Sequence, residues 1–327
     1  MIGQEHGTTM PIDGPTGHGS GVVGIDIGGT KIAALLVNAE GTVLARGSVP
    51  APAALGGGAM ADAAAGLATA LAEEAEVSLA AAGVGAAGVI DHETGTIRAA
   101  SATFVGWAGF PLADELEARL GVPVRVENDV NAFLLGEVAA AGRTDLDVLG
   151  VMLGTGVGGA LIIGGDLHHG PHGAAGEIGH TPGYSELVCT CGQIGHLETL
   201  ASGTSIALRY QERVALTERP APDAGEIADR ARGGDADAIA VFDAAGRALA
   251  LACASAATIL DLPCAIVGGG VAGAWDLLEP AIARTLRTDS PVSGIPLRII
   301  PAVLGSDAVA LGAIETARRA LVPAGAH

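Results

Sequence analysis

A short glycine turn near the start of the sequence has the residue types of a phosphate-binding site. The segment Asp26–Lys31 reads DIGGTK and follows an apolar run. Paired glycines let the backbone approach a phosphate closely, and exposed N–H groups there bind anions. An aspartate at the end of a strand can hold Mg²⁺ through water. An ordinary hairpin turn with an incidental aspartate is the alternative. The candidate residues are Asp26, Gly28, Gly29, Thr30 and Lys31.

A second glycine turn, Gly154–Gly159, has the spacing G-x-G-x-x-G. In a dinucleotide site this fingerprint requires a helix directly after the glycines. Here the apolar segment Ala160–Ile163 follows and predicts a strand, so the dinucleotide interpretation fails. A second phosphate-binding hairpin fits better, with Gly154, Thr155 and Gly156 as its candidate residues.

A third glycine run, Gly268-Gly269-Gly270, lies between a predicted buried strand and a predicted helix. The N-terminus of a helix after glycines binds anions and nucleotides well. A plain tight turn is the alternative. The sequence has no G-x-x-x-x-G-K-[ST] segment, which excludes a P-loop kinase.

Asp129 lies within Glu127-Asn128-Asp129-Val130-Asn131, at a predicted strand-to-helix junction. A carboxylate there is often only a helix N-cap. The amides beside Asp129, however, can orient a polyhydroxylated substrate. Asp129 is therefore a candidate general base that takes a proton from an alcohol, as phosphoryl transfer requires.

A segment rich in glycine, histidine and cysteine predicts a metal site. It begins at Gly176-Glu177-Ile178-Gly179-His180 and ends at His196-Leu197-Glu198. Two nitrogen and two sulfur ligands make a closed tetrahedral Zn²⁺ set, so the zinc would be structural. Chance clustering is the alternative, which the scarcity of cysteine disfavours. The predicted ligands are His180, Cys189, Cys191 and His196, whereas His168, His169 and His172 are interpreted as loop residues.

Hydrophobic periodicity predicts the strands and helices that position these motifs. A strand meander is expected over 22–29, 32–37 and 42–48, then a helix at 59–82, a strand at 84–90 and a helix at 112–120. A strand at 122–126, a helix at 129–141 and strands at 148–153 and 160–163 follow. Helices from about 204, at 226–231 and at 235–260, a strand at 265–267, a helix at 275–286, a strand at 297–300 and a helix at 308–321 complete the chain. Two meanders, each followed by crossover helices, predict two similar α/β domains.

Composition narrows the class of protein. At roughly 150 residues per domain, 327 residues predict two domains. Apolar residues make up 49% and charged residues 16%, which excludes disorder for most of the chain. The net charge of −19 and the lack of Lys/Arg runs disfavour a nucleic-acid partner. No uninterrupted apolar stretch reaches the roughly 18 residues of a membrane span, and the polar first twenty residues lack a signal peptide, so we expect a cytoplasmic protein.

Together, in this order and at these distances, the five motifs resemble the ROK family of sugar kinases, repressors and related proteins, from about Val22 to Leu321. The resemblance implies an α/β, actin-like (ribonuclease H-like) ATPase fold of two domains with an interdomain cleft, in a homodimer or homotetramer. We expect a flexible tail over 1–20. A smaller domain would combine 21–128 with a C-terminal helix at about 308–323, and 129–307 would form the larger domain with the zinc loop 176–198.

The resemblance also implies roles for the candidate residues. Asp129 would be the catalytic base acting on the 6-hydroxyl of a hexose. Asp26, Gly28, Gly29 and Thr30 would face the γ-phosphate and Mg²⁺, Gly154–Gly156 would hold phosphates, and Gly268–Gly270 would lie on the adenosine side of ATP. The sugar hydroxyls would be bound by Asn128, Glu177, His180 and Glu198. His180 would have a double role, because one ring nitrogen would bind zinc while the rest of the ring faces the sugar.

Two positions depart from the family pattern. His196 stands where the family usually has a third cysteine, and Gly85-Ala86-Ala87-Gly88 where it often has Gly-x-Pro-Gly. Histidine is a good zinc ligand, so we expect the metal site to be retained. The second departure affects the fine shape of the sugar pocket. Glucose and the N-acetylhexosamines, including N-acetylglucosamine and N-acetylmannosamine, are the leading candidate substrates, and polyphosphate is an alternative donor to ATP.

Two other functions are considered. A DNA-binding repressor is disfavoured because only about twenty loop-like residues precede Val22, which leaves no room for a winged-helix domain. A catalytically silent sugar sensor would be expected to lose the base or a phosphate turn, and this sequence keeps Asp129 and both turns. We therefore predict an ATP-dependent sugar kinase.

Overall fold

The structure is a computed structural model, and its described residues are 19–100, 104–142, 147–214 and 221–321. Most of the tail predicted over 1–20 lies outside the described residues, as do residues 322 and 323 of the predicted C-terminal helix. Ser20, assigned to the tail, already belongs to the first strand.

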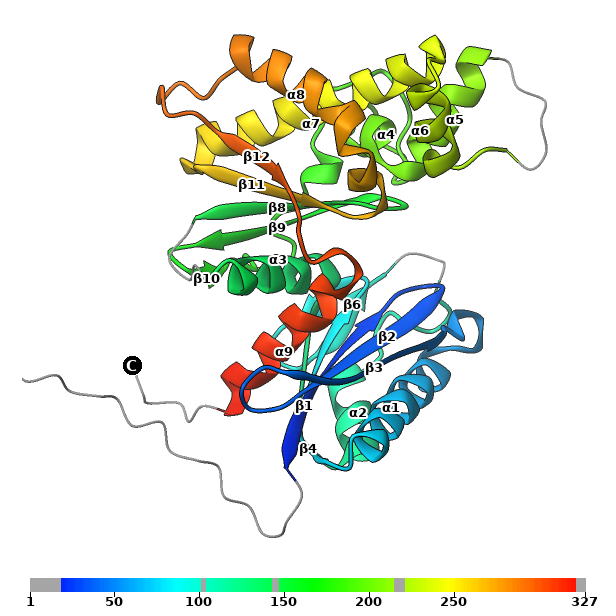
Figure 1. Cartoon of the computed structure of the whole chain (residues 1–327), viewed down its shortest axis with the longest axis vertical. Coiled ribbons are helices and arrows are strands. Elements are labelled where there is room, and N and C mark those ends of the chain that lie inside the picture. The colour runs from blue at the N-terminus through cyan, green and yellow to red at the C-terminus, as the bar shows by residue number, and fades with distance from the viewer. Residues whose placement is uncertain (1–18, 101–103, 143–146, 215–220, 322–327) are drawn as a thin grey trace, which may run out of the picture.

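Two five-stranded sheets with the same strand order make up the core of the fold (Figure 1). In the first, β1 (Ser20–Ile27), β2 (Lys31–Val37) and β3 (Val43–Pro50) form an antiparallel meander, and β4 (Ser78–Ala86) and β7 (Val124–Asn128) extend it in parallel with β1. In the second, β8 (Val148–Leu153), β9 (Val157–Ile163) and β10 (Asp166–Leu167) form the meander, extended by β11 (Cys264–Gly268) and β12 (Arg298–Pro301). The repeated order β3-β2-β1-β4-β7 and β10-β9-β8-β11-β12 agrees with the prediction of two similar α/β units.

Helices cover both faces of each sheet. On the first sheet, α1 (Gly57–Glu74) and α2 (Leu112–Leu120) lie on one face and α9 (Ala308–Leu321) on the other. On the second, α3 (Asp129–Ala140) covers the face opposite α7 (Ala236–Leu260). Packed with α7 are α4 (Glu198–Ala201), α5 (Gly203–Val214), α6 (Ala224–Arg232) and α8 (Trp275–Thr288). Short elements complete the fold, namely η1 (Ala53–Leu55), β5 (Val89–Asp91), β6 (Thr96–Ala99), η2 (Ile178–His180), η3 (Gly270–Ala274) and η4 (Gly305–Asp307).

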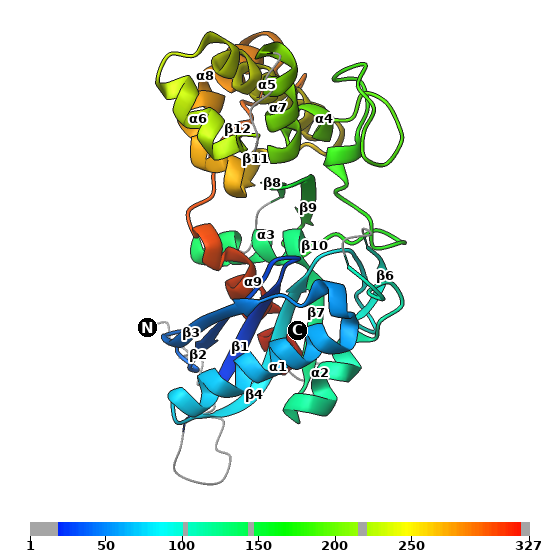
Figure 2. The same ribbon diagram turned by 90° about the vertical axis from the view of Figure 1, so that its right-hand side faces the viewer.

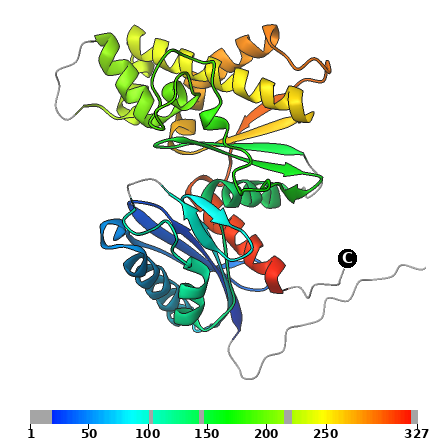
Figure 3. The same cartoon turned by 180° about the vertical axis from the view of Figure 1, so that it is seen from behind.

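The helices α3 and α9 pack against each other between the two sheets (Figure 2). Glycines let α9 approach both α3 and the first sheet closely. A Cβ on Gly312 of α9 would lie 1.6 Å from the carbonyl oxygen of Ala132 in α3. A Cβ on Gly24 of β1 would lie 2.0 Å from the carbonyl oxygen of Ala310 in α9. Seen from behind, the last helix lies beside the first strands of the chain (Figure 3). The end of the described chain therefore packs on the first sheet.

The predicted helix over 59–82 is wrong at its end. Helix α1 stops at Glu74, Glu76 adopts a left-handed φ of 53°, and residues 78–82 belong to β4. Alanine favours helices in isolation, but β4 is a central strand between β1 and β7 that is covered on both faces, and small residues such as Gly83 allow α9 to approach it closely. The predicted strand over 84–90 is also two strands, separated at Gly88, whose φ is +116°.

One helix, α7, is long and apolar enough to cross a membrane by length and composition, although we expected no membrane span from the sequence. Of its most apolar window, 61% is buried inside the protein. Leu249, Cys253 and Ala250 on this helix are fully enclosed in the core above the second sheet. Its apolar character is therefore explained by packing.

Candidate active site

The predicted site residues gather where the parallel strands of each sheet end, the usual ligand-binding edge of such sheets. In the first sheet, Asp26 of β1 is in register with Gly85 of β4, which is in register with Glu127 of β7. In the second, Gly268 of β11 is in register with Met152 of β8. Strand pairing thus brings Asp26 close to the junction that begins at Glu127. In the second sheet it brings the glycine run that begins at Gly268 close to the turn that begins at Gly154.

Asp129 is the first residue of α3, and the N-cap of that helix is Asn128. The side-chain oxygen of Asn128 accepts the backbone N–H groups of Val130 at 2.9 Å and Asn131 at 3.2 Å. Its Nδ2 donates to the carbonyl of Gly88 at 2.9 Å and to Oδ1 of Asp129 at 3.1 Å. The capping alternative for Asp129 is therefore wrong. Because the Asn128 amide has two donors and two acceptor positions, a sugar hydroxyl that bound it would replace one of these bonds.

Three carboxyl groups influence one another at this junction. Burial, together with the nearby charge of Asp129, raises the pKa of Asp26 to about 7, although Lys31 opposes the shift. Burial also raises the pKa of Asp129, with hydrogen bonds from Val130 and Asn128 opposing and the charge of Glu177 adding to the shift. Such shifts are typical of functional sites. Asp26 and Asp129 come from the first sheet's edge, and Glu177 comes from a loop of the second sheet.

The loop that carries Glu177 is held against the second glycine turn. Gly176, with a φ of +91°, lies so close to β9 that an added Cβ would be 2.7 Å from the carbonyl oxygen of Gly159. Glu177 itself is exposed, and its carboxylate makes no hydrogen bond to the part of the chain that the structure describes. On the other side of the turn, the side chain of Val130 lies 2.6 Å from where a Cβ on Gly158 would stand. The start of α3 and the Glu177 loop therefore flank the same turn.

Glu198, a predicted sugar ligand, contacts the second glycine turn. Its Oε2 accepts the backbone N–H of Val157 at 2.9 Å, and its Oε1 accepts the hydroxyl of Thr190 at 2.8 Å. A Cβ on Gly156 would lie 2.6 Å from Oε2, so a side chain there would displace this carboxylate. Glu198 thus links the segment containing Cys189 and Cys191 to the turn predicted to hold phosphates.

The glycines of the three turns differ in their surroundings. Gly28 donates its N–H to the carbonyl of Lys31 at 3.1 Å, which closes the first turn. Gly154 and Gly270 have open space beside their α-carbons. In contrast, Gly268 abuts a buried aromatic ring and Gly269 has a φ of +87°. A tight turn therefore explains Gly269, and close packing explains Gly268 at the end of β11, whereas Gly154 and Gly270 leave room for a ligand. Thr30, Lys31 and Thr155 are exposed beside these turns.

The four predicted metal ligands come together. One ligand atom from each of His180, Cys189, Cys191 and His196 lies within 4.8 Å of all the others. The Cys191 Sγ and His196 Nδ1 atoms are 3.3 Å apart, and the Cys189 Sγ and His180 Nδ1 atoms are 3.8 Å apart. Zinc bonds of about 2.0 to 2.3 Å in a tetrahedron require ligand spacings of this size. The donor set and its geometry fit Zn²⁺.

One contact of the site has no signal in the sequence. His169, interpreted above as a loop residue, places Nε2 2.7 Å from Oε2 of Glu127. The two residues are 42 positions apart, and His169 belongs to none of the five motifs, although Glu127 opens one of them. The hydrogen bond between His169 and Glu127 is therefore visible only in the tertiary structure.

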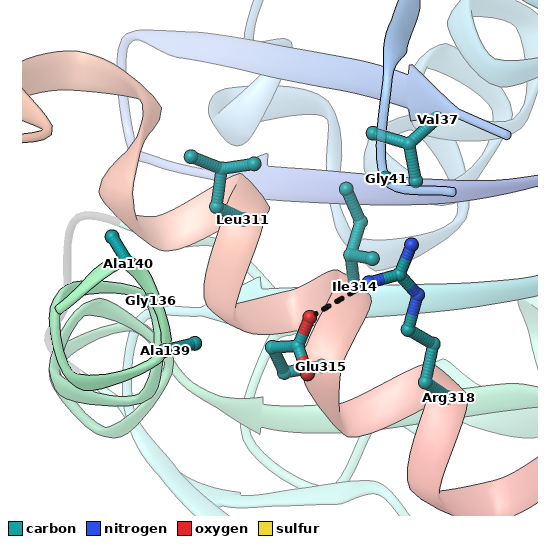
Figure 4. Close-up of a pocket in the computed structure, with 9 residues that line it drawn as sticks. All are labelled: Val37, Gly41, Gly136, Ala139, Ala140, Leu311, Ile314, Glu315 and Arg318. Carbon is teal, nitrogen blue, oxygen red and sulfur yellow. Dashed lines mark hydrogen bonds and ion pairs between the residues drawn. The ribbon is translucent and has the colours of Figure 1, made fainter. Parts of the chain in front are cut away.

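Two small hollows lie away from these residues. One, of about 200 Å³, lies between α3, α9 and the turn after β2, beside the ion pair of Glu315 with Arg318 at 3.0 Å (Figure 4). The other, of about 300 Å³, lies between α2 and the turn after β5. Neither is lined by a residue of the predicted site.

Comparison with known proteins identifies the family. The model of the ROK family matches residues 22–320. A glucokinase of Streptomyces coelicolor is 35% identical over 319 residues, covering 90% of this chain and 97% of the relative, and an N-acetylmannosamine kinase of Escherichia coli is 34% identical over 295 residues, covering 88% and 95%. The crystal structure of a ROK family glucokinase from Streptomyces griseus, in complex with glucose and AMPPNP, has a TM-score of 0.79 at 33% identity and covers 91% of this chain and 99% of that one. The predicted α/β, actin-like fold is thereby confirmed, and the chain belongs to the ROK family.

Proposed function

We propose that this protein is a sugar kinase that transfers the γ-phosphoryl group of ATP to the 6-hydroxyl of glucose or an N-acetylhexosamine. The observation that carries the proposal is the position of Asp129 at the start of α3, held by Asn128 and close to Asp26 and Glu177. Relatives named glucokinase and N-acetylmannosamine kinase, and a neighbour that holds glucose with an ATP analogue, support the same class of reaction.

In this proposal Asp129 accepts or orients the proton of the sugar hydroxyl. Its raised pKa favours proton uptake, because the carboxylate at this buried position is a stronger base than in water. Asn128 fixes the carboxylate through its bond to Oδ1, which limits the directions from which a hydroxyl can approach. Glu177 and the exposed part of His180 bind other sugar hydroxyls, and Glu198 orients the neighbouring turn while contributing to the sugar pocket. Closure of the interdomain cleft excludes water during transfer.

The glycine turns hold the nucleotide in this proposal. The Gly28–Lys31 turn and the Gly154–Gly156 turn present backbone N–H groups to the phosphates, and Gly270 borders the adenosine side. Asp26 would hold Mg²⁺, which would neutralise phosphate charge. Burial is the main cause of the raised pKa of Asp26, and a bound cation would favour the charged form of this carboxyl group.

A structural zinc ion bound by His180, Cys189, Cys191 and His196 is the third part of the proposal. The four residues fit the ion in number, chemistry and spacing. They belong to the segment that carries Glu198, so the metal would stiffen the support of the second glycine turn. The zinc site would therefore act through positioning.

For the domains, the oligomeric state and the cellular location, we propose what the sequence analysis predicted. Residues 21–128 with the C-terminal helix form the smaller domain and 129–307 the larger, with α3 and α9 at their boundary. A homodimer or homotetramer is expected in solution, and light scattering coupled to size-exclusion chromatography tests it. A cytoplasmic location is expected from the composition, and cell fractionation tests it.

The decisive experiment is a coupled ADP-release assay with Mg²⁺-ATP on glucose, mannose, fructose, N-acetylglucosamine and N-acetylmannosamine. A strong preference for one sugar supports the proposal and names the substrate. A parallel series with polyphosphate, followed by detection of sugar phosphate, identifies the donor. Sugar binding without turnover by zinc-loaded protein would contradict the proposal and support a silent sugar sensor.

A further inference from the structure

Glu127 is a buried carboxylate at the end of β7, directly before Asn128 and Asp129, and its side chain is 6% exposed. Its Oε1 accepts the backbone N–H of Asn128 at 2.8 Å and the side-chain amide of Asn131, also at 2.8 Å. The backbone N–H of Asn131 in turn donates to the side-chain oxygen of Asn128. Glu127 is therefore bonded, at one oxygen, to two residues of the junction that presents Asp129.

The remaining oxygen of Glu127 is bound by His169, which comes from the second sheet. His169 follows β10, and its Nε2 lies 2.7 Å from Oε2 of Glu127. Its ring stacks on that of His92 in the turn between β5 and β6, with centroids 4.5 Å apart and planes 9° apart. The hydrogen bond to Glu127 raises the pKa of His169, so the imidazole stays protonated to a higher pH. His169 is thus held by two contacts with the first half of the molecule.

The same histidine anchors the loop that carries Glu177. The carbonyl of His169 accepts the N–H of Ala175 at 3.1 Å, which closes a short loop two residues before Glu177. Within that loop Gly173 lies against β5, since a Cβ there would be 2.8 Å from the carbonyl oxygen of Ile90. One side-chain bond, from His169 to Glu127, therefore connects the Glu177 loop to the Asp129 junction.

We propose that His169 is a positioning residue for the sugar site, whose bond to Glu127 sets the relative placement of Glu177 and Asp129. This inference rests on the proposed function, because the two carboxylates matter as a pair only if both face a sugar. Displacements of about 1 Å in such a site can reduce turnover by about 100-fold. Among the described residues, neither His169 nor Glu127 makes a side-chain hydrogen bond or ring contact with a glycine turn, so we expect KM for ATP to change little.

The test compares His169→Leu, which removes the donor and keeps a similar volume, with His169→Gln, whose amide can still donate to Glu127. We expect kcat with the preferred sugar to fall about 10- to 100-fold in His169→Leu, with KM for ATP unchanged, and to recover largely in His169→Gln. His168→Leu is the matched control, because His168 is the exposed neighbour and its side chain makes no hydrogen bond, ion pair or ring contact with the described residues. Adding Glu127→Gln to His169→Leu should cause little further loss, since both changes remove the same bond.

Several outcomes would overturn the inference. Normal kcat and sugar KM in a folded His169→Leu variant would do so, as would an equal loss in His168→Leu or a lowered melting temperature with unchanged kinetics. If His169→Leu does not fold, His169→Asn replaces it, because that amide is too short to reach Glu127. If the wild-type protein phosphorylates no sugar, the proposed function fails and amide hydrogen exchange decides this inference separately. Faster exchange at Asn128 and Asn131 in the variant than in wild type supports the positioning role, and equal exchange refutes it.

Discussion

Replacing Asp26 by asparagine should make the protein more stable at alkaline pH while removing its activity. Burial raises the pKa of Asp26 from 3.8 to about 7. A shift of about 3 pKa units at 1.36 kcal/mol per unit corresponds to about 4 kcal/mol. The native state holds this proton more tightly than the unfolded state. The free energy of unfolding therefore falls as pH rises from about 4 to about 7. Above that range the native state has lost the full amount, about 4 kcal/mol, because Asp26 is ionised in both states.

Asparagine has the same shape and no charge, so the variant avoids this cost. We expect the free energy of unfolding of Asp26→Asn to exceed that of wild type by up to about 4 kcal/mol at pH 8, and to equal it near pH 4. Since Asp129 contributes to the shift, Asp129→Asn should reproduce part of the effect. Urea unfolding followed by circular dichroism at pH 5, 6, 7 and 8 measures the difference.

The control for this experiment is Asp114→Asn, which changes an exposed aspartate at the start of α2. Its stability difference from wild type should vary little across the series. The reasoning is refuted if Asp26→Asn is less stable than wild type at pH 8, or if its advantage is the same at pH 5 and pH 8. Sugar-kinase activity of Asp26→Asn close to wild type would separately remove Asp26 from the proposed Mg²⁺ site.

Three further predictions concern other parts of the molecule. Asp129→Asn should fold but lose at least ~100-fold in kcat, the contribution of a positioned base, and near-normal turnover would remove Asp129 from that role. Cys191→Ser should release zinc and weaken sugar binding, measured by elemental analysis and calorimetry, whereas unchanged zinc content would refute the metal site. Glu137→Leu should lower the free energy of unfolding by about 3 kcal/mol, because the buried carboxylate accepts the N–H groups of Val303 and Leu304 just before α9. Glu137→Gln, which keeps an acceptor, should cost less in the same urea titration, and equal losses would contradict this account.

Elements with a clear local pattern are predicted well from the sequence. The limits of α2, β8 and α9 match the predicted ranges. The second glycine turn joins two strands, as its apolar flank indicates. The four metal ligands lie within one segment of the chain, so their residue types and spacing predict their assembly without knowledge of the rest of the fold.

Errors occur where tertiary packing outweighs local preference. The alanines after Glu74 favour a helix, but burial between two neighbouring strands makes them part of β4. Two residues that the resemblance assigns to the sugar have further contacts, which are not errors of prediction: Asn128 is the N-cap of α3, because its side-chain oxygen accepts two backbone N–H groups. Glu198 contacts Val157, 41 residues earlier, through a fold that the sequence does not display.

The chemistry of this protein is thus determined largely by the sequence, since glycine turns, a carboxylate at a strand end and a set of nitrogen and sulfur ligands are local features. Their mutual placement is decided by the tertiary structure. Parallel strand pairing brings Asp26 beside the Asp129 junction, and the crossing of α3 and α9 joins the two sheets. The bond between Glu127 and His169 exists because burial leaves a carboxylate in need of a donor, and only the folded chain supplies one at 2.7 Å.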